Sequence, residues 1–115
     1  TNQGLCALRV TIWLALMGRR GIRRLAEINV ATAAYARKAL ARAGLRLPYA
    51  APGFNEFVVE VPKLAQRLER CRAQGLQPGV SLERFGPEHA NQLLVCVTEM
   101  NARSQIDALV RELSA

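Results

Sequence analysis

The sequence has 115 residues, half of them apolar, and no low-complexity tract. This composition predicts one small folded domain and excludes a disordered chain. The net charge of +7 is uneven, because residues 1–46 hold nine basic residues and one acidic residue.

The basic N-terminal part leaves two interpretations open. It favours an anionic partner such as nucleic acid, an acidic protein or a phosphate. It also suits a solvated helix face in a protein that prefers arginine, since arginine outnumbers lysine fourteen to two. Aromatic residues are few and none alternates with the arginine pairs, so a base-stacking surface is not indicated and nucleic acid is the weaker prediction.

Residues 3–17 are predicted to form a helix that is apolar on nearly every face. Such a helix is normally buried between layers, and little in this chain is left to cover it. Thr1 or Asn2 is the expected N-cap, and Gly18 and Gly21 are expected to end the helix. Because the chain also begins with Thr1 in place of Met, we expect a piece of a longer protein. The apolar stretch is shorter than the about 20 residues that cross a bilayer, and no signal peptide precedes it, so no membrane association is expected.

A second helix is predicted over residues 22–43, and Gly44 is expected to end it. Its expected inner stripe consists of apolar and small residues at helical spacing: Ile22, Leu25, Ile28 or Asn29, Ala33, Ala36 and Leu40. Residues 45–47 alternate between apolar and polar side chains, which predicts a short strand. We therefore divide the chain into two helices over residues 1–44 and a small α+β domain over residues 45–115.

The elements expected after residue 45 follow the order strand, strand, helix, strand, strand, helix. Residues 54–61 alternate as a half-buried strand does, and Pro62 is expected at the first position of the next helix. Residues 80–85 predict a short strand, residues 86–91 a loop and residues 93–98 an interior strand. Asn101 is the expected cap of a last helix over residues 102–113. The expected fold is α+β, a small, mainly antiparallel sheet with helices on one face.

No catalytic, cofactor-binding or metal-binding residue can be assigned from the sequence. His89 is the single histidine, and Lys38 and Lys63 lie in contexts that do not favour a Schiff base. Cys6, Cys71 and Cys96 are odd in number and far apart, so they support neither disulfides nor a metal site. Each is expected to be a small buried apolar residue, and the lack of a disulfide framework favours a cytoplasmic location.

Three polar clusters are the candidate functional residues. They lie where helices or strands meet loops, and their alternative role is capping or turn formation. The candidates for a substrate entrance or a subunit interface are Thr1, Asn2, Gln3, Asn55, Glu56, Thr98 and Glu99.

Three separated motifs resemble one family. The first eight residues, TNQGLCAL, resemble a stretch of glycine dehydrogenase (decarboxylating) subunit 1. Leu47-Pro48 followed by FNEFVV over residues 54–59 is similar to a second motif of that family. A third set resembles its closing segment, namely PGV at residues 78–80, LLVCVTEMN at residues 93–101 and IDALV at residues 106–110. The motifs are collinear, so the resemblance covers the whole chain.

The resemblance implies a C-terminal piece of the first subunit of a two-subunit glycine decarboxylase, the P-protein of the glycine cleavage system. That family has the aspartate-aminotransferase-like fold, fold type I, of pyridoxal-phosphate enzymes. This piece would correspond to the end of its large domain, the long connecting helix and the small C-terminal domain. The implied reaction decarboxylates glycine and transfers the aminomethyl group to the lipoyl H-protein. The implied partners are subunit 2, which carries the pyridoxal-phosphate lysine, and the H-protein, in a heterotetramer.

Two further expectations depend on this resemblance. Arg9 stands where the family usually has a small apolar residue, which puts the burial of that helix face in question. No cofactor is expected on this chain, so the isolated chain is predicted to be inactive. A free-standing protein-interaction domain that docks through its first helix is the other alternative.

Overall fold

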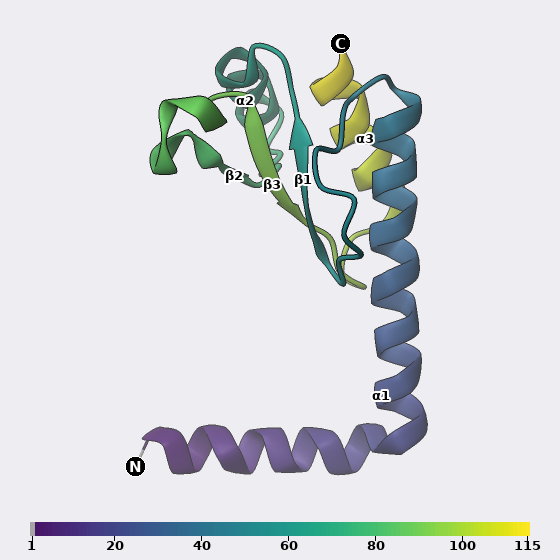
Figure 1. The fold of residues 1–115 in the computed structure, drawn as a ribbon. Helices are drawn as coiled ribbons and strands as arrows, with labels where there is room; N and C mark the ends of the chain where they lie inside the picture. Colours follow the sequence, from purple (N-terminus) through teal and green to yellow (C-terminus); the bar gives the residue numbers. More distant parts are fainter. Residues whose placement is uncertain (1) are drawn as a thin grey trace.

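A three-stranded antiparallel sheet with helices on one face forms the body of the protein (Figure 1). The computed structural model describes residues 2–115, so the predicted cap at Thr1 lies outside the described residues. The elements in chain order are α1 (Asn2–Arg42), β1 (Glu56–Glu60), α2 (Leu64–Ala73), β2 (Val80–Ser81), the 3₁₀ turns η1 (Leu82–Phe85) and η2 (Pro87–His89), β3 (Gln92–Cys96) and α3 (Arg103–Ser114). The predicted α+β class is confirmed.

The sheet has the order β1-β3-β2, with β3 in the centre. In β1 and β3 the register runs from Glu56 opposite Cys96 to Glu60 opposite Gln92. Because side chains alternate along a strand, this register places Phe57, Val59, Leu93 and Val95 on one face, where all four are buried. The alternation predicted for residues 54–61 is therefore confirmed.

All three helices pack against that inner face. The core cluster joins the sheet to buried residues from each helix, namely Ala36, Leu40, Leu45, Phe57, Val59, Val61, Leu64, Cys71, Leu93, Val95, Val97, Ile106 and Leu113. On α1, the buried residues Asn29, Ala33, Ala36 and Leu40 follow the predicted stripe. Small alanines on this stripe let the helix lie close to the sheet.

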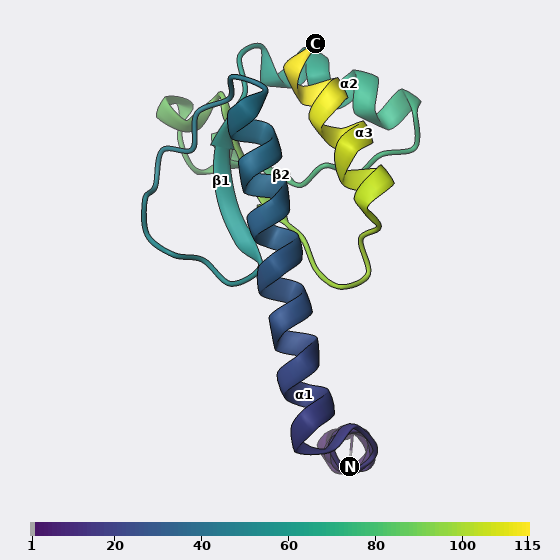
Figure 2. The same ribbon diagram turned by 90° about the vertical axis from the view of Figure 1, so that its right-hand side faces the viewer.

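The helix α1 bends sharply at Gly18, where φ is 58° and ψ is 178°. We call residues 2–17 the arm and residues 19–42 the rod. The upper part of the rod runs beside the sheet, whereas the arm leaves the lower end of the rod and runs below the body, separated from it (Figure 1). Figure 2 looks along the arm and shows that it projects clear of the other elements. The prediction of two helices is thus confirmed, although Gly18 alone separates them and Gly21 is helical.

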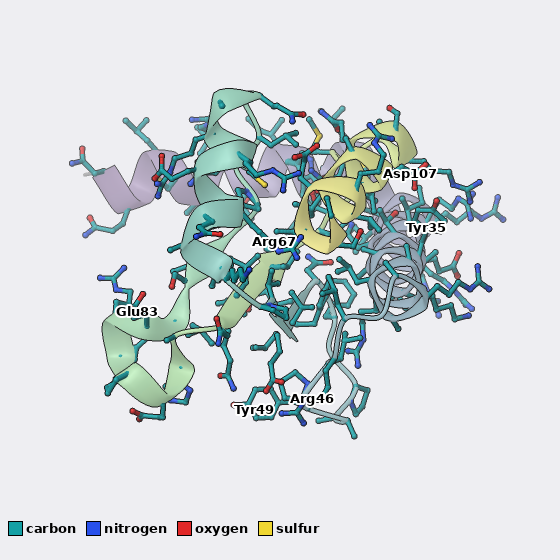
Figure 3. The ribbon with its side chains drawn as sticks, turned by 90° about the horizontal axis from the view of Figure 1, so that it is seen from above. Tyr35, Arg46, Tyr49, Arg67, Glu83 and Asp107 are labelled. Carbon is teal, nitrogen blue, oxygen red and sulfur yellow. The ribbon has the colours of Figure 1, made fainter. Side chains whose placement is uncertain are left out.

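Two contacts fasten the rod and the following segment to the body. The Tyr35 hydroxyl donates to Asp107 Oδ1 on α3 over 2.6 Å, and the Arg103 guanidinium lies 4.5 Å from the Tyr35 ring centroid. Figure 3 shows Tyr35 and Asp107 facing each other across the two helices. At the β1 edge of the sheet, residues 45–47 make only one bridge, between Arg46 and Glu60, where a strand was predicted.

Several local predictions were wrong. Residues 80–85 form a strand only at Val80–Ser81, because the Ser81 hydroxyl accepts the Glu83 N–H and turns the chain into η1. Pro62 does not open α2, which begins at Leu64 after Lys63 in a left-handed conformation with φ of 56°. The cap of α3 is Ala102, whose N–H is bonded by Gln105 Oε1 over 2.8 Å.

The cysteines divide into two kinds. Cys71 is buried, as predicted, and burial raises the pKa of its thiol. Cys6 on the arm and Cys96 at the end of β3 are exposed, so the prediction of burial was wrong for both. Cys96 points to the outer face because the alternation of β3 buries Val95 and Val97 on either side of it.

Candidate functional site: the apolar arm and the strand-end polar clusters

The arm exposes large apolar side chains on every side. Leu16 is 81% exposed and Leu5 is 65% exposed, and even Trp13 keeps 44% of its surface accessible. The other exposed apolar residues of the arm are Leu8, Val10, Ile12 and Leu14. Soluble proteins rarely leave a continuous apolar surface of this kind uncovered, so it marks a contact surface. The all-round apolar pattern of residues 3–17 predicts this feature from the sequence.

Gly18 gives the arm its direction. A Cβ atom at this position would meet no heavy atom within 4 Å, so space does not require glycine there. The backbone conformation requires it, because a positive φ combined with an extended ψ is open almost only to glycine. The bend therefore depends on a single residue.

Arginines cluster where the rod begins. Arg19, Arg20, Arg23 and Arg24 are all exposed. Arg23 and Arg24 share the carboxylate of Glu27, at 3.0 and 3.8 Å, and no ion pair among the described residues involves Arg19 or Arg20. This cluster carries much of the basic charge noted in the sequence.

Two of the three predicted polar clusters come together. Asn55 and Glu56 begin β1 and Thr98 and Glu99 follow β3, so the antiparallel pairing brings them to the same end of the sheet. The Val97 N–H donates to the Asn55 carbonyl over 2.9 Å. Asn2 and Gln3 are exposed at the far tip of the arm, separated from this end (Figure 1). Thr1 lies outside the described residues.

The strand-end residues differ in the hydrogen bonds and ion pairs that their side chains form. Thr98 closes a turn, since its N–H donates to Asn101 Oδ1 over 2.8 Å and its hydroxyl accepts the Met100 N–H over 3.2 Å. Glu56 and Glu99 are exposed and form no ion pair with a described residue. Asn55 Oδ1 is buried and accepts no hydrogen bond from the described part of the chain. Glu56 and Glu99 thus remain available for a contact, whereas Thr98 has a structural role.

The single histidine and the two lysines belong to different elements of the structure. No group of three or more potential metal ligands occurs among residues 2–115. His89 Nδ1 lies 2.9 Å from Gln92 Oε1, which ties the ring to the start of β3. Lys38 on the rod and Lys63 before α2 are exposed and belong to different elements.

A groove between the rod and residues 52–57 was not predicted. It has a volume of about 270 Å³ and is lined by Val30, Ala33, Ala34, Arg37, Lys38, Pro52, Gly53, Phe54, Glu56 and Phe57. The Arg37 guanidinium lies 5.9 Å from the Phe57 ring centroid. The periodicity of the rod places Arg37 beside its inner stripe, but no pattern shows that residues 52–54 return to the same helix face.

No described helix is long and apolar enough to span a bilayer. No protein-family model matches the chain. Among curated relatives, the "Probable glycine dehydrogenase (decarboxylating) subunit 1" of Geobacillus thermodenitrificans is 39% identical over 98% of this chain and 25% of its own length. The protein of the same description from Geotalea uraniireducens is 43% identical over 98% of this chain and 26% of its own length.

A solved structure agrees with these relatives. The "glycine decarboxylase (P-protein) of the glycine cleavage system, in inhibitor-bound form" superposes with a TM-score of 0.81 and 28% identity, over 99% of this chain and 26% of that one. The chain thus spans about a quarter of the length of the proteins it matches. From end to end, it is homologous to about one quarter of glycine dehydrogenase (decarboxylating) subunit 1.

Proposed function

We propose that this chain acts as a structural part of a glycine decarboxylase and is inactive alone. The whole enzyme would decarboxylate glycine and transfer the aminomethyl group to the lipoyl H-protein. The observation that carries the proposal is the arm, an apolar helix that nothing in the described chain covers. A part that is complete in itself would not keep so much apolar surface in water.

The rest of the same subunit is the proposed cover for the arm. Curated relatives are about four times longer than the matched region, which leaves three quarters of their length to supply that cover. The superposition with the P-protein structure includes 99% of this chain, so the aligned region extends over the arm. Each methylene group buried on docking would contribute about 0.8 kcal/mol.

We place pyridoxal phosphate in the partner subunit. The residues described here do not fit the cofactor. A Schiff-base lysine needs a site where desolvation or a neighbouring cation lowers its pKa, and both lysines of this chain are exposed. No step of the reaction is therefore assigned to a side chain of this chain. Subunit 2, the H-protein, a heterotetrameric assembly and a cytoplasmic location belong to the same proposal.

Fragment complementation tests the proposal. The chain would be co-expressed with subunit 2 and with the Geobacillus thermodenitrificans subunit 1 from which the matched quarter has been removed. We expect the three polypeptides to co-purify and, with H-protein added, to exchange bicarbonate with the glycine carboxyl group. Omitting this chain should remove the exchange.

A double variant, Leu8→Glu with Leu16→Glu, provides the matched control. Both residues are exposed in the chain alone, so the body should still fold. Two buried carboxylates on the arm should prevent docking and abolish the exchange. Full exchange with this double variant would refute the proposed role of the arm, and no exchange with the unaltered chain would refute the proposed function.

A further inference from the structure

The groove between the rod and residues 52–57 contains a cation that no described residue neutralises. Arg37 is half-buried, and it takes part in no hydrogen bond or ion pair of 4.0 Å or less with residues 2–115. A guanidinium can keep its charge in such a place because its pKa lies far above neutrality. Taking the guanidinium partly out of water without a carboxylate partner is nevertheless unfavourable. An anion bound in the groove would compensate this cost.

The Arg37 guanidinium lies near an aromatic ring and a glycine. Its central carbon is 5.9 Å from the Phe57 ring centroid, and Phe57 itself belongs to the core with 7% exposure. Gly53 lets the backbone pass close to Arg37 and to the backbone of Glu56, since a Cβ there would lie 3.6 Å from Arg37 Nη1 and 2.4 Å from the Glu56 carbonyl oxygen. A guanidinium presents a planar fork of donors, which suits a bidentate partner such as a carboxylate.

The charges and apolar atoms of the groove restrict what could bind. Arg37 and Lys38 supply two positive charges and Glu56 one negative charge, so the lining has a net charge of +1. This balance matches a monoanion better than a phosphate dianion. Val30 and Phe54 are half exposed along the groove, at 47% and 53%, and offer apolar contact to a short hydrocarbon chain.

We propose that this groove binds a small organic monocarboxylate, with the carboxylate on Arg37 and the apolar part against Val30 and Phe54. The site is separate from the arm, and the inference does not rest on the proposed function. The ligand class follows from the unpaired guanidinium, the net charge and the apolar walls together.

Propionate is the probe, and the Arg37 Nε–Hε signal in an ¹⁵N-labelled sample is the readout. The host would be the whole chain carrying Leu8→Glu and Leu16→Glu, which keeps the arm from self-associating without touching the groove. We expect saturable shifts with a dissociation constant on the order of millimolar, as a ligand of this size with one charge-assisted pair permits. Propionamide, the uncharged analogue, should produce no saturable shift, and phosphate at equal ionic strength should bind more weakly.

Three variants at the groove separate recognition from a general charge effect. Arg37→Gln should weaken binding at least about tenfold, followed on the Phe57 ring signals. The affinity of Arg37→Lys for propionate should lie between those of the original chain and Arg37→Gln, because lysine keeps the positive charge but lacks the planar fork of donors. Glu56→Gln should tighten binding about threefold, because it removes a negative charge that repels the propionate carboxylate. Equal shifts with propionate and propionamide, unchanged affinity in Arg37→Gln, or tighter binding of phosphate would each overturn the proposal.

Discussion

Gly18 determines the shape of the molecule through one pair of backbone angles. On either side of it, the arm and the rod are regular helix, so neither has another place to bend. An L-amino acid at φ of 58° and ψ of 178° would carry strain of about 1–3 kcal/mol. A continuous helix would relieve that strain, since nothing within the described body holds the arm.

We therefore expect Gly18→Ala to straighten α1. The exposed Cys6 and Cys96 can be spin-labelled, whereas Cys71 is buried and its thiol pKa is raised, so it should react slowly. Double electron–electron resonance between the two labels should report an altered distance in Gly18→Ala. Gly4→Ala is the control, because Gly4 is helical and a Cβ there meets nothing within 4 Å. Identical distributions in all three proteins would contradict the assigned role of Gly18.

Tyr35 links the rod to α3, and this link depends on pH. The hydrogen bond to Asp107 raises the pKa of Tyr35 above its ordinary value of 10.0, and desolvation adds to the rise. The folded state thus holds the phenolic proton more tightly than the unfolded state. The contribution to stability is complete below pH 10 and is lost as the pH rises through the folded-state pKa.

Tyr35→Phe should reveal this dependence. At neutral pH the variant should unfold at a lower urea concentration than the original chain, because Asp107 loses its donor. The difference between the two midpoints should shrink once the pH exceeds 10. A constant difference from neutral pH to pH 11 would show that Tyr35 acts through packing alone.

At the scale of elements, α1 has two environments within one helix. Leu40 on the rod is fully buried in the core, whereas Leu16 on the arm is 81% exposed. The rod joins the core from Asn29 onward, whereas no residue of the arm is buried. The domain boundary expected at residue 44 stays a prediction.

The same substitution at these two positions should have opposite consequences. Leu40→Ala should lower the free energy of unfolding by about 2–5 kcal/mol through lost burial and a cavity. Leu16→Ala should change it by no more than about 0.5 kcal/mol in the chain alone. Urea denaturation of both variants measures the contrast, and equal losses would mean that the arm packs against the body in solution.

Elements with strong periodicity could be predicted from the sequence, and elements fixed by single contacts could not. The stripe from Ala33 to Leu40 and the alternation from Phe57 to Val61 specify buried faces by themselves. The cap of α3 could not be foreseen, because Asn101 is used by the turn at Thr98 and Gln105 takes over at Ala102. Arg37 was missed because its groove forms between segments that only tertiary structure brings together.

At the scale of the whole molecule, the body is independent of the arm. The buried residues all lie between Asn29 and Leu113, so none belongs to the arm. The arm adds apolar surface without adding to this core. It should therefore affect the association of the chain far more than its stability.

Removal of residues 1–17 should separate these two effects. The free energy of unfolding of the shortened chain should lie within about 0.5 kcal/mol of that of the full chain. In sedimentation experiments the full chain of 12.7 kDa should self-associate through the arm, and the shortened chain should remain a monomer. A monomeric full chain, or a large loss of stability on shortening, would contradict this division.

The position of the arm ahead of the body has a consequence for synthesis. A ribosome makes residues 2–17 before any residue of the core, so the most apolar helix emerges while its own body does not yet exist. Preceding segments of a longer polypeptide could receive it at once, during translation. A separately made copy would have to be shielded by a chaperone until its cover arrives, which makes the order of translation part of how this helix reaches its place.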